Sequence, residues 1–171
     1  MKYDKINSEL FKKNRKNFIA KMKPNSVAFF NSNDIYPVSA DSTLPFEQQR
    51  DIFYLSGVDQ EESVLMLTTN SEKTGYKEVL FLKETSPHIA VWEGPKLDKK
   101  QAYETSGIET VFWLDEMEKI IDDVMQNCET IYYNHNEHYR AKVEVETREE
   151  RFNKWIESKF ENKRKERSNP I

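Results

Sequence analysis

The sequence is poor in the residues that build several common kinds of functional site. Its 171 residues include only four glycines, three histidines and one cysteine, Cys128. A single cysteine excludes an internal disulfide and favours a reducing compartment. The glycines are too far apart to form a phosphate-binding loop or a dinucleotide fingerprint, and the chain has no Gly-x-Ser-x-Gly elbow. Glycine-rich nucleotide loops and serine-hydrolase elbows are therefore excluded.

Long apolar runs are missing as well. No stretch approaches the length of a transmembrane span, and the first seven residues lack the apolar run that a signal peptide needs. The net charge of −4 gives no electrostatic footprint for nucleic acid. Hydrophobic residues make up 37% of the chain and charged residues 33%, which suits a buried core with a solvated surface. We therefore expect a cytoplasmic protein that binds neither membrane nor nucleic acid.

The hydrophobic pattern predicts an α/β fold with a mixed sheet flanked by helices. An amphipathic helix is expected over residues 7–22, with Phe11, Phe18 and Met22 on one face. Further helices are expected over residues 98–106, 115–126 and 142–163. Short apolar strands are expected over residues 26–30, 51–55, 64–67, 79–82, 110–113 and 130–133, with a loop at 31–49 and a hairpin turn at 70–75.

The polar tail is the only candidate linker. We expect one domain over residues 1–160, followed by the start of a linker over residues 161–171. Residues 163–167 read Lys-Arg-Lys-Glu-Arg, a basic run that would suit contact with nucleic acid. Because the whole chain is acidic, we interpret this run as the solvated end of a helix.

Clustered titratable groups are scarce, so the chemistry of the residues alone indicates no catalytic site. His135 and His138 are the best pair for a metal, but they follow a predicted strand and lack the helical two-histidine arrangement of zinc peptidases. We interpret them as exposed loop residues. Cys128 has no nearby base in the sequence, and a small buried apolar residue is the better interpretation.

Three stretches and the opening of the chain carry a resemblance to a known family. Residues 38–57 read VSADSTLPFEQQRDIFYLSG, residues 60–67 read QEESVLML, and LFL at 80–82 is followed by VWEGPKL at 91–97. The segment from Phe11 to Ala28 is similar to the first helix and strand of the same family. In this order and spacing, the chain resembles the N-terminal domain of aminopeptidase P, over nearly all of residues 8–140.

The resemblance implies a ribonuclease-H-like fold, as in the N-domains of creatinase and prolidase. It also implies a C-terminal "pita-bread" domain, absent from these residues, that binds two divalent metal ions, usually manganese, through two Asp, one His and two Glu. None of those motifs occurs here. The isolated chain is therefore expected to be no enzyme and to bind no metal, while its parent would be an Xaa-Pro metalloaminopeptidase. The N-domain would shape substrate access and make subunit contacts in a homo-oligomer.

The resemblance also selects residues for the substrate channel or an interface. Trp92, before the turn at Gly94-Pro95, would stack on a substrate proline or close the edge of the core. Asp41 would meet a substrate ammonium group or a neighbouring chain, or instead bond backbone amides in a capped turn. Arg50 and Tyr54 share one face of the predicted strand, and Tyr54 also suits the core. A later arginine of the family would be Arg148 or Arg151.

Two other functions remain open at this point. Some relatives of the peptidase fold bind peptides or proteins without catalysis, histone-chaperone subunits among them. Prolidase has a similar N-domain and cleaves only dipeptides. The segment around Trp92 favours aminopeptidase P over prolidase.

Overall fold

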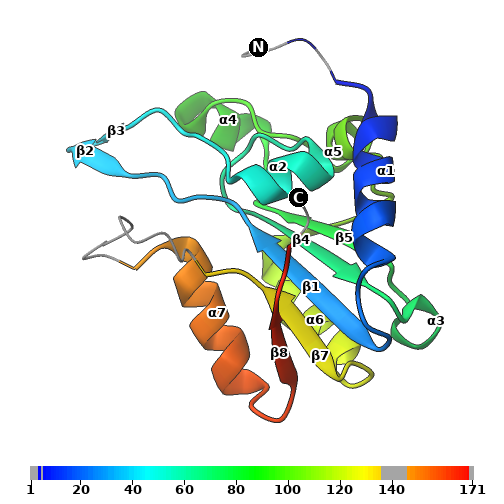
Figure 1. Cartoon of the computed structure of the whole chain (residues 1–171). Helices are drawn as coiled ribbons and strands as arrows, with labels where there is room; N and C mark the ends of the chain where they lie inside the picture. The colour runs from blue at the N-terminus through cyan, green and yellow to red at the C-terminus, as the bar shows by residue number, and fades with distance from the viewer. Residues whose placement is uncertain (1–3, 5, 136–145, 170–171) are drawn as a thin grey trace.

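A mixed six-stranded sheet forms the centre of the molecule (Figure 1). The computed structural model describes residue 4 and residues 6–135 and 146–169, and the side chains of Ile89 and Trp92 lie outside the description. The strand order is β6 (Thr110–Trp113), β5 (Glu78–Leu82), β4 (Ser63–Thr68), β1 (Ser26–Asn31), β7 (Thr130–Tyr133) and β8 (Arg164–Arg167). Only β4 is antiparallel to its neighbours, pairing Ala28 with Leu67 and Leu65 with Leu80.

This pairing brings the carboxyl-terminal ends of five strands to the same edge of the sheet. β5 pairs with β6 in parallel, as β1 does with β7 and β7 with β8, and β4 runs antiparallel to both β1 and β5. The segments that follow β1, β5, β6, β7 and β8 therefore leave the sheet at one edge, which we call the carboxyl edge. Ligands of α/β proteins bind most often at such an edge.

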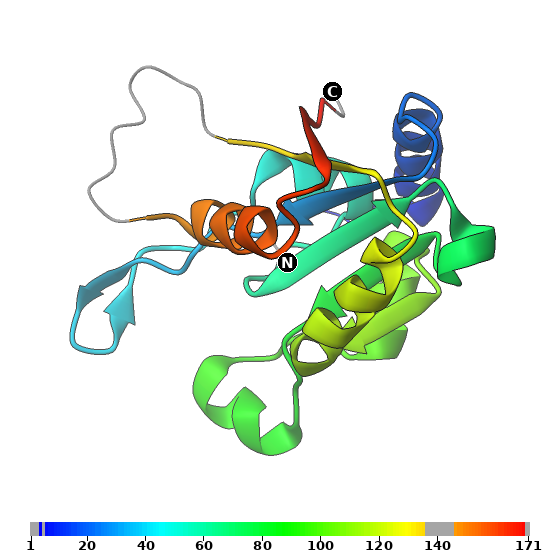
Figure 2. The same ribbon diagram turned by 90° about the horizontal axis from the view of Figure 1, so that it is seen from below.

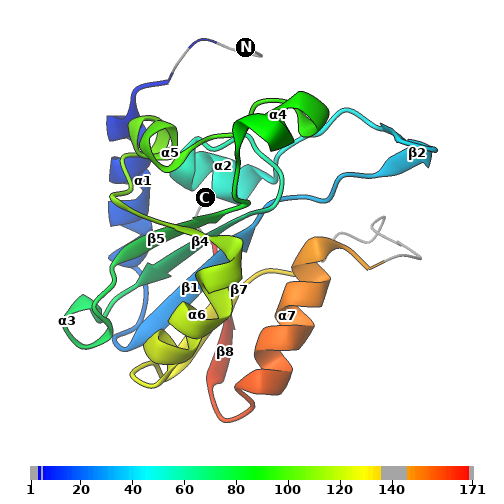
Figure 3. The same cartoon turned by 180° about the vertical axis from the view of Figure 1, so that it is seen from behind.

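Helices cover both faces of the sheet. On one face lie α1 (Ser8–Ile19), α2 (Arg50–Ser56) and α5 (Lys99–Ser106), whose apolar side chains pack with Phe30, Leu65 and Leu80. On the other face lie α6 (Met117–Met125) and α7 (Arg148–Lys159), which pack with strand residues of opposite parity such as Phe29 and Phe81 (Figure 3). Side chains of a strand alternate between faces, so each strand serves both cores. The predicted α/β class with a mixed, helix-flanked sheet is confirmed.

End-capping residues explain where several helices begin and end. The Oδ1 of Asn7 accepts a hydrogen bond from Glu9 N at 2.9 Å, which starts α1 as the sequence predicts. At α5, Asp98 and Gln101 form a reciprocal capping box, and Gly107 closes the helix with a φ of 71°. The helix predicted over 115–126 is confirmed as a short 3-10 turn, η1 (Leu114–Glu116), that continues into α6.

The strand predicted over residues 51–55 is wrong, because these residues form α2. The side chain of Gln49 accepts hydrogen bonds from Asp51 N at 2.5 Å and Ile52 N at 3.3 Å, which starts a helix. Ile52 and Leu55 are fully buried at helical spacing, and Gly57 ends the helix with a φ of 70°. Local capping and burial on one face therefore outweigh the β-propensity of the aromatic residues in this stretch.

Two predicted connections contain structure of their own. β4 and β5 form the expected antiparallel pair, but their connection includes the short helix α3 (Ser71–Thr74). The predicted loop over 31–49 holds β2 (Pro37–Ser39) and β3 (Ser42–Thr43), which pair as a small hairpin. We call residues 33–46 the hairpin arm. It projects from the carboxyl edge on the same side of the molecule as α4 (Pro87–Glu93) (Figure 2).

The polar tail contributes a strand to the sheet. Residues 164–167 form β8, in parallel register with β7, so the interpretation of the basic run as a helix end is wrong. The charged side chains lie on an edge strand, where they discourage pairing with another chain. The helix predicted over 142–163 is the shorter α7, and residues 142–145 lie outside the described residues.

No helix in the described part of the chain is long and apolar enough to cross a lipid bilayer.

Candidate functional site

A polar cavity of about 720 Å³ opens at the carboxyl edge. The end of β1, the start of α2, the end of β7 and the start of α7 all reach it, although these segments lie far apart in the sequence. Its titratable lining residues are Glu47, Arg50, Asp51, His135, Arg148, Glu149 and Arg167. Charged groups of both signs therefore converge on one concave surface, the usual setting of a binding site.

Arg148 is a cation of this site whose side chain has no partner among the described residues. Thr147 caps α7 by accepting a hydrogen bond from Glu150 N at 3.3 Å, and Arg148 N donates to Asp34 Oδ2 at 2.5 Å. The Arg148 guanidinium makes no hydrogen bond or ion pair with a described residue, and its Nε is buried. Burial lowers the pKa of Arg148, while the nearby carboxylates of Glu62 and Asp34 act in the opposite direction.

Arg151, one turn further along α7, is already occupied. Its Nη2 lies 2.8 Å from Asp34 Oδ1, and its Nη1 donates to the carbonyl oxygen of Glu146 at 2.7 Å. Half of the Arg151 side chain is exposed to solvent. Of the two late arginines that the sequence offers, Arg148 lines this cavity without a described partner, whereas Arg151 is paired with Asp34.

The side chains of two asparagines form hydrogen bonds that connect elements beside the cavity. Asn134 follows β7, and its Nδ2 donates to Asp51 Oδ2 at 2.7 Å. Asn153 of α7 is fully buried, and its Nδ2 donates to the carbonyl oxygen of Asn134 at 2.7 Å. These two hydrogen bonds join the start of α2, the end of β7 and the middle of α7, so these three elements beside the cavity are fixed relative to one another.

Glu149, the second residue of α7, has a raised pKa. Burial, followed by the neighbouring carboxylates of Asp51 and Glu150, raises the pKa of Glu149 to about 7, against a smaller opposing effect of His135. His135 Nδ1 lies 2.8 Å from Glu150 Oε1. The carboxyl group of Glu149 is thus half protonated near neutral pH in the folded protein.

Glu149→Gln should make the stability of the protein less dependent on pH. The pKa of Glu149 rises on folding from its ordinary value of 4.5 to about 7, so the folded state holds a proton that the unfolded state releases. Stability therefore falls as pH rises from about 4.5 to about 7, and the full penalty applies above that range. We expect Glu149→Gln to be more stable than wild type by about 1–3 kcal/mol at pH 8, and equal to it near pH 4.5.

Urea denaturation at the two pH values measures this difference. Glu72→Gln in the exposed α3 is the matched control, and it should leave the free energy of unfolding unchanged at both pH values. A Glu149→Gln variant with the same pH slope as wild type would show that the Glu149 carboxyl group is ionised throughout.

The residues selected from the sequence are distributed along the carboxyl edge. Arg50 lines the cavity from the first turn of α2. Arg50 and Tyr54 do share a face, but as residues four apart on a helix. Tyr54 packs against the core and its carbonyl oxygen accepts a hydrogen bond from Asn14 Nδ2 at 2.8 Å, so it lies apart from the cavity.

Asp41 lies at the exposed tip of the hairpin arm. The turn at this tip includes Ala40, which has a φ of 50°. No hydrogen bond joins the Asp41 carboxylate to another described residue, so the capped turn considered for Asp41 is not formed there. The carboxylate is therefore available to a molecule that approaches the arm.

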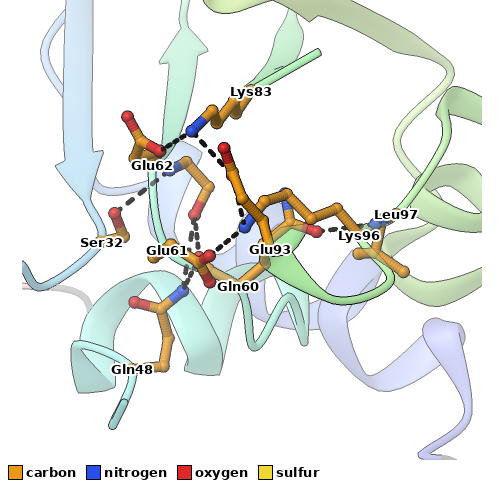
Figure 4. A network of polar contacts seen from close by, with 10 residues as sticks. Ser32, Gln48, Gln60, Glu61, Glu62, Lys83, Glu93, Lys96 and Leu97 are labelled. Carbon is orange, nitrogen blue, oxygen red and sulfur yellow. Dashed lines mark hydrogen bonds and ion pairs between the residues drawn. The ribbon is translucent and has the colours of Figure 1, made fainter. Parts of the chain in front are cut away.

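Trp92 lies in the short helix α4, which ends just before Gly94-Pro95, and its side chain is outside the described part of the structure. A chain of ion pairs anchors this helix to the body of the molecule (Figure 4). Lys83 Nζ lies 2.9 Å from Glu93 Oε2 and 3.0 Å from Glu62 Oε2, and the nearly buried Lys96 joins Glu93 at 3.6 Å to Glu61. The network holds the last residue of α4 against the loop before β4.

The described residues contain no metal site and no activated nucleophile. No group of three or more His, Cys, Asp or Glu side chains among them is arranged to hold a metal ion. His135 is paired with Glu150, and His138 lies outside the described residues. Cys128 is buried, and burial raises the pKa of its thiol to about 11, so it is unreactive at neutral pH. The prediction of a buried cysteine is confirmed.

Comparisons with known proteins agree on one family. Residues 11–132 match the family model described as "Aminopeptidase P, N-terminal domain". The chain belongs to this family. The Xaa-Pro aminopeptidase of Escherichia coli is 26% identical over 149 residues, which cover 87% of this chain and 34% of the relative. Human Xaa-Pro aminopeptidase 3 is 24% identical over 104 residues, which cover 60% of this chain and 20% of the relative.

Solved structures of aminopeptidase P share the fold. The aminopeptidase PepP of Pseudomonas aeruginosa superposes with a TM-score of 0.74 at 21% identity, covering 95% of this chain and 36% of the other. E. coli aminopeptidase P with the inhibitor Pro-Leu superposes with a TM-score of 0.69 at 24% identity, covering 81% and 31%. The predicted aminopeptidase P N-domain fold is thus confirmed. The chain spans about a third of the length of the bacterial relatives it matches.

Proposed function

We propose that this chain is the non-catalytic N-terminal domain of a metal-dependent Xaa-Pro aminopeptidase, which removes the residue before proline at the start of a peptide. The observation that carries the proposal is the family match over residues 11–132, with Xaa-Pro aminopeptidases among its relatives. The proposed role of the domain is to shape substrate access from its carboxyl edge. Its partners would be the catalytic domain of the same protein, further copies of that protein and the peptide.

The chemistry of the reaction belongs outside these residues. Hydrolysis by two metal ions needs bridging carboxylates that activate water, and no described cluster here fits such a ligand set. The two divalent ions, with manganese as the expected metal, would therefore be held by the catalytic domain. The side chains described here would bind and orient the peptide.

Three features of the carboxyl edge support this binding role. Arg148 carries a guanidinium without a described partner and Arg50 lines the same cavity, which suits a peptide carboxylate or carbonyl. Asp41 on the hairpin arm offers an unpaired carboxylate to a substrate ammonium group. The backbone of Trp92 lies in α4, which follows β5 at this edge, and a tryptophan is a residue type that stacks well on a proline ring.

The hairpin arm supports the proposed contacts with other parts of the assembly. Ile35, Tyr36, Val38 and Leu44 are the large apolar side chains of the arm with more than 40% of their surface exposed. Exposed apolar groups gathered on one projection mark an interaction surface. The homo-oligomer and the cytoplasmic location stay predictions.

Trp92→Ala in the whole peptidase should lower kcat/KM for Xaa-Pro substrates several-fold. The loss of one stacked ring costs about 1 kcal/mol in binding the transition state, and each 1.4 kcal/mol is a factor of about ten in rate constant. The melting temperature should change little. Steady-state kinetics on an Xaa-Pro-Xaa peptide, with the melting temperature of the same samples, separate the two effects.

Trp113→Ala is the matched control, because Trp113 packs against the core and should lower the melting temperature instead. If Trp92→Ala lowers the melting temperature strongly and leaves kcat/KM of the folded enzyme unchanged, Trp92 belongs to the core and the substrate role is wrong.

A further inference from the structure

A second cavity, of about 520 Å³, lies between α7 and the segment that leads into α6. The helices α6 and α7 cover the same face of the sheet (Figure 3). Its walls are mixed: Leu114, Met117, Phe152 and Trp155 supply apolar surface, and polar or charged side chains supply the rest. A pocket of this size with both apolar and charged walls fits a small amphipathic organic molecule better than an inorganic ion.

Two buried polar groups of this cavity have no partner among the described residues. Asn31, at the end of β1, is 2% exposed, and its Oδ1 has no hydrogen-bond partner. Arg148 also lines the cavity, and its guanidinium makes no bond with a described residue. Buried polar groups in folded proteins are nearly always hydrogen-bonded, so one unpaired acceptor and one unpaired cation in the same cavity call for an explanation.

The charges around the cavity leave one anion unpaired as well. Arg151 is neutralised by Asp34 at 2.8 Å, and Glu118 by Lys159 at 2.6 Å. Asp115 in η1 is exposed, lines the cavity and makes no side-chain hydrogen bond or ion pair with any described residue. Three groups at the cavity therefore lack a partner among the described residues: the Arg148 guanidinium, the Asp115 carboxylate and Asn31 Oδ1.

We propose that this cavity binds a free apolar α-amino acid. The carboxylate of the ligand pairs with the Arg148 guanidinium, and its ammonium group donates to Asp115 and to Asn31 Oδ1. The side chain of the ligand packs on the rings of Phe152 and Trp155, whose centroids lie 5.5 Å apart. Arg148 borders both cavities, so this ligand and a peptide carboxylate at the first cavity would compete for one guanidinium. The other contacts of the proposed ligand belong to this cavity alone.

The charge pattern distinguishes this ligand from simpler ones. A carboxylate without an ammonium group leaves Asp115 and Asn31 unpaired, and an amine without a carboxylate leaves Arg148 unpaired. A binding experiment with matched compounds can therefore test each contact. The probe is L-leucine, with L-leucinamide lacking the carboxylate and 4-methylpentanoate lacking the ammonium group.

Titration of the ¹⁵N-labelled 171-residue chain should show saturable shifts for L-leucine, with a dissociation constant of about 1 mM or below. The shifts should involve the amides of Asn31, Met117 and Arg148 and the indole N–H of Trp155, which Trp155→Phe identifies. L-leucinamide and 4-methylpentanoate should each bind at least tenfold more weakly. Absence of saturation by L-leucine, or equal binding of the three compounds, would overturn the proposal.

Two variants test the assigned contacts. Asp115→Asn should weaken L-leucine several-fold and leave 4-methylpentanoate unchanged, since only the ammonium group meets Asp115. Arg148→Gln should weaken L-leucine at least tenfold, whereas Lys154→Gln, on the exposed side of α7, should have no effect. If L-leucine binds to Asp115→Asn and Arg148→Gln as to wild type, the cavity is not its site. If Arg148→Gln does not fold, the three compounds on wild type still decide.

Discussion

Arg15→Ala is expected to lower the free energy of unfolding by about 3–5 kcal/mol, because it breaks a buried charge network from one side. Arg15 of α1 is fully buried, and its Nε pairs with Glu78 Oε2 of β5 at 2.8 Å. Its Nη1 donates to the carbonyl oxygens of Leu55 at 2.8 Å and Ser106 at 3.0 Å, at the ends of α2 and α5. One side chain thus joins three helices and a strand.

Chemical denaturation of the 171-residue chain measures the loss. Lys16→Ala is the matched control, since Lys16 is the next residue of the same helix and is exposed. Arg15→Met keeps most of the volume and removes the charge, so it should cost less than Arg15→Ala. A loss below about 1 kcal/mol for Arg15→Ala would mean that the network adds nothing to stability.

Gly57→Ala should destabilise the protein by about 2–5 kcal/mol, through two effects of one methyl group. Gly57 ends α2 with a φ of 70°, a conformation that costs an L-residue about 1–2 kcal/mol. A Cβ at this position would also lie 2.3 Å from Cε2 and 2.4 Å from Cζ of the buried Phe11 ring. Such a clash forces the ring or the backbone to move, at a further cost of about 1–3 kcal/mol.

Gly75→Ala separates the two effects. Gly75 has a φ of 75°, but no atom lies within 4 Å of the place where its Cβ would be. This variant should therefore lose only the conformational part, about 1–2 kcal/mol. Equal losses of unfolding free energy in Gly57→Ala and Gly75→Ala would show that the contact with Phe11 is not tight.

Much of the fold can be predicted from local patterns. The strands β4 and β5 are continuous apolar runs that are buried on both faces, and α5 has an N-cap and a C-terminal glycine in the sequence. The patterns fail where contacts with distant residues decide the conformation. α2 has an aromatic-rich sequence, yet it is a helix because Gln49 caps it and one face is buried. β8 has a charged sequence, yet it is a strand because it extends the sheet beside β7.

The candidate site could be predicted only in part, and only through the family resemblance. Arg50 and Arg148 are nearly a hundred positions apart, and they line one cavity because β1 and β7 are neighbours in the sheet. The pKa of Glu149 is raised by burial and by the carboxylate of Asp51, and no local sequence pattern shows either cause. The local sequence indicates the site only through the places of two residues. His135 follows a strand, and Arg148 starts a helix at the same edge of the sheet.

We propose that this domain serves a peptidase specific for a proline in the second position. The most direct test is to express the complete reading frame that contains residues 1–171 and to measure release of free alanine from Ala-Pro-Ala and from Ala-Ala-Ala, with Mn²⁺ present. We predict cleavage of Ala-Pro-Ala alone by the whole protein, and no release from either peptide by residues 1–171. Failure of the whole protein to cleave Ala-Pro-Ala, or cleavage of that peptide by the isolated residues above a metal-only control, would contradict the claim.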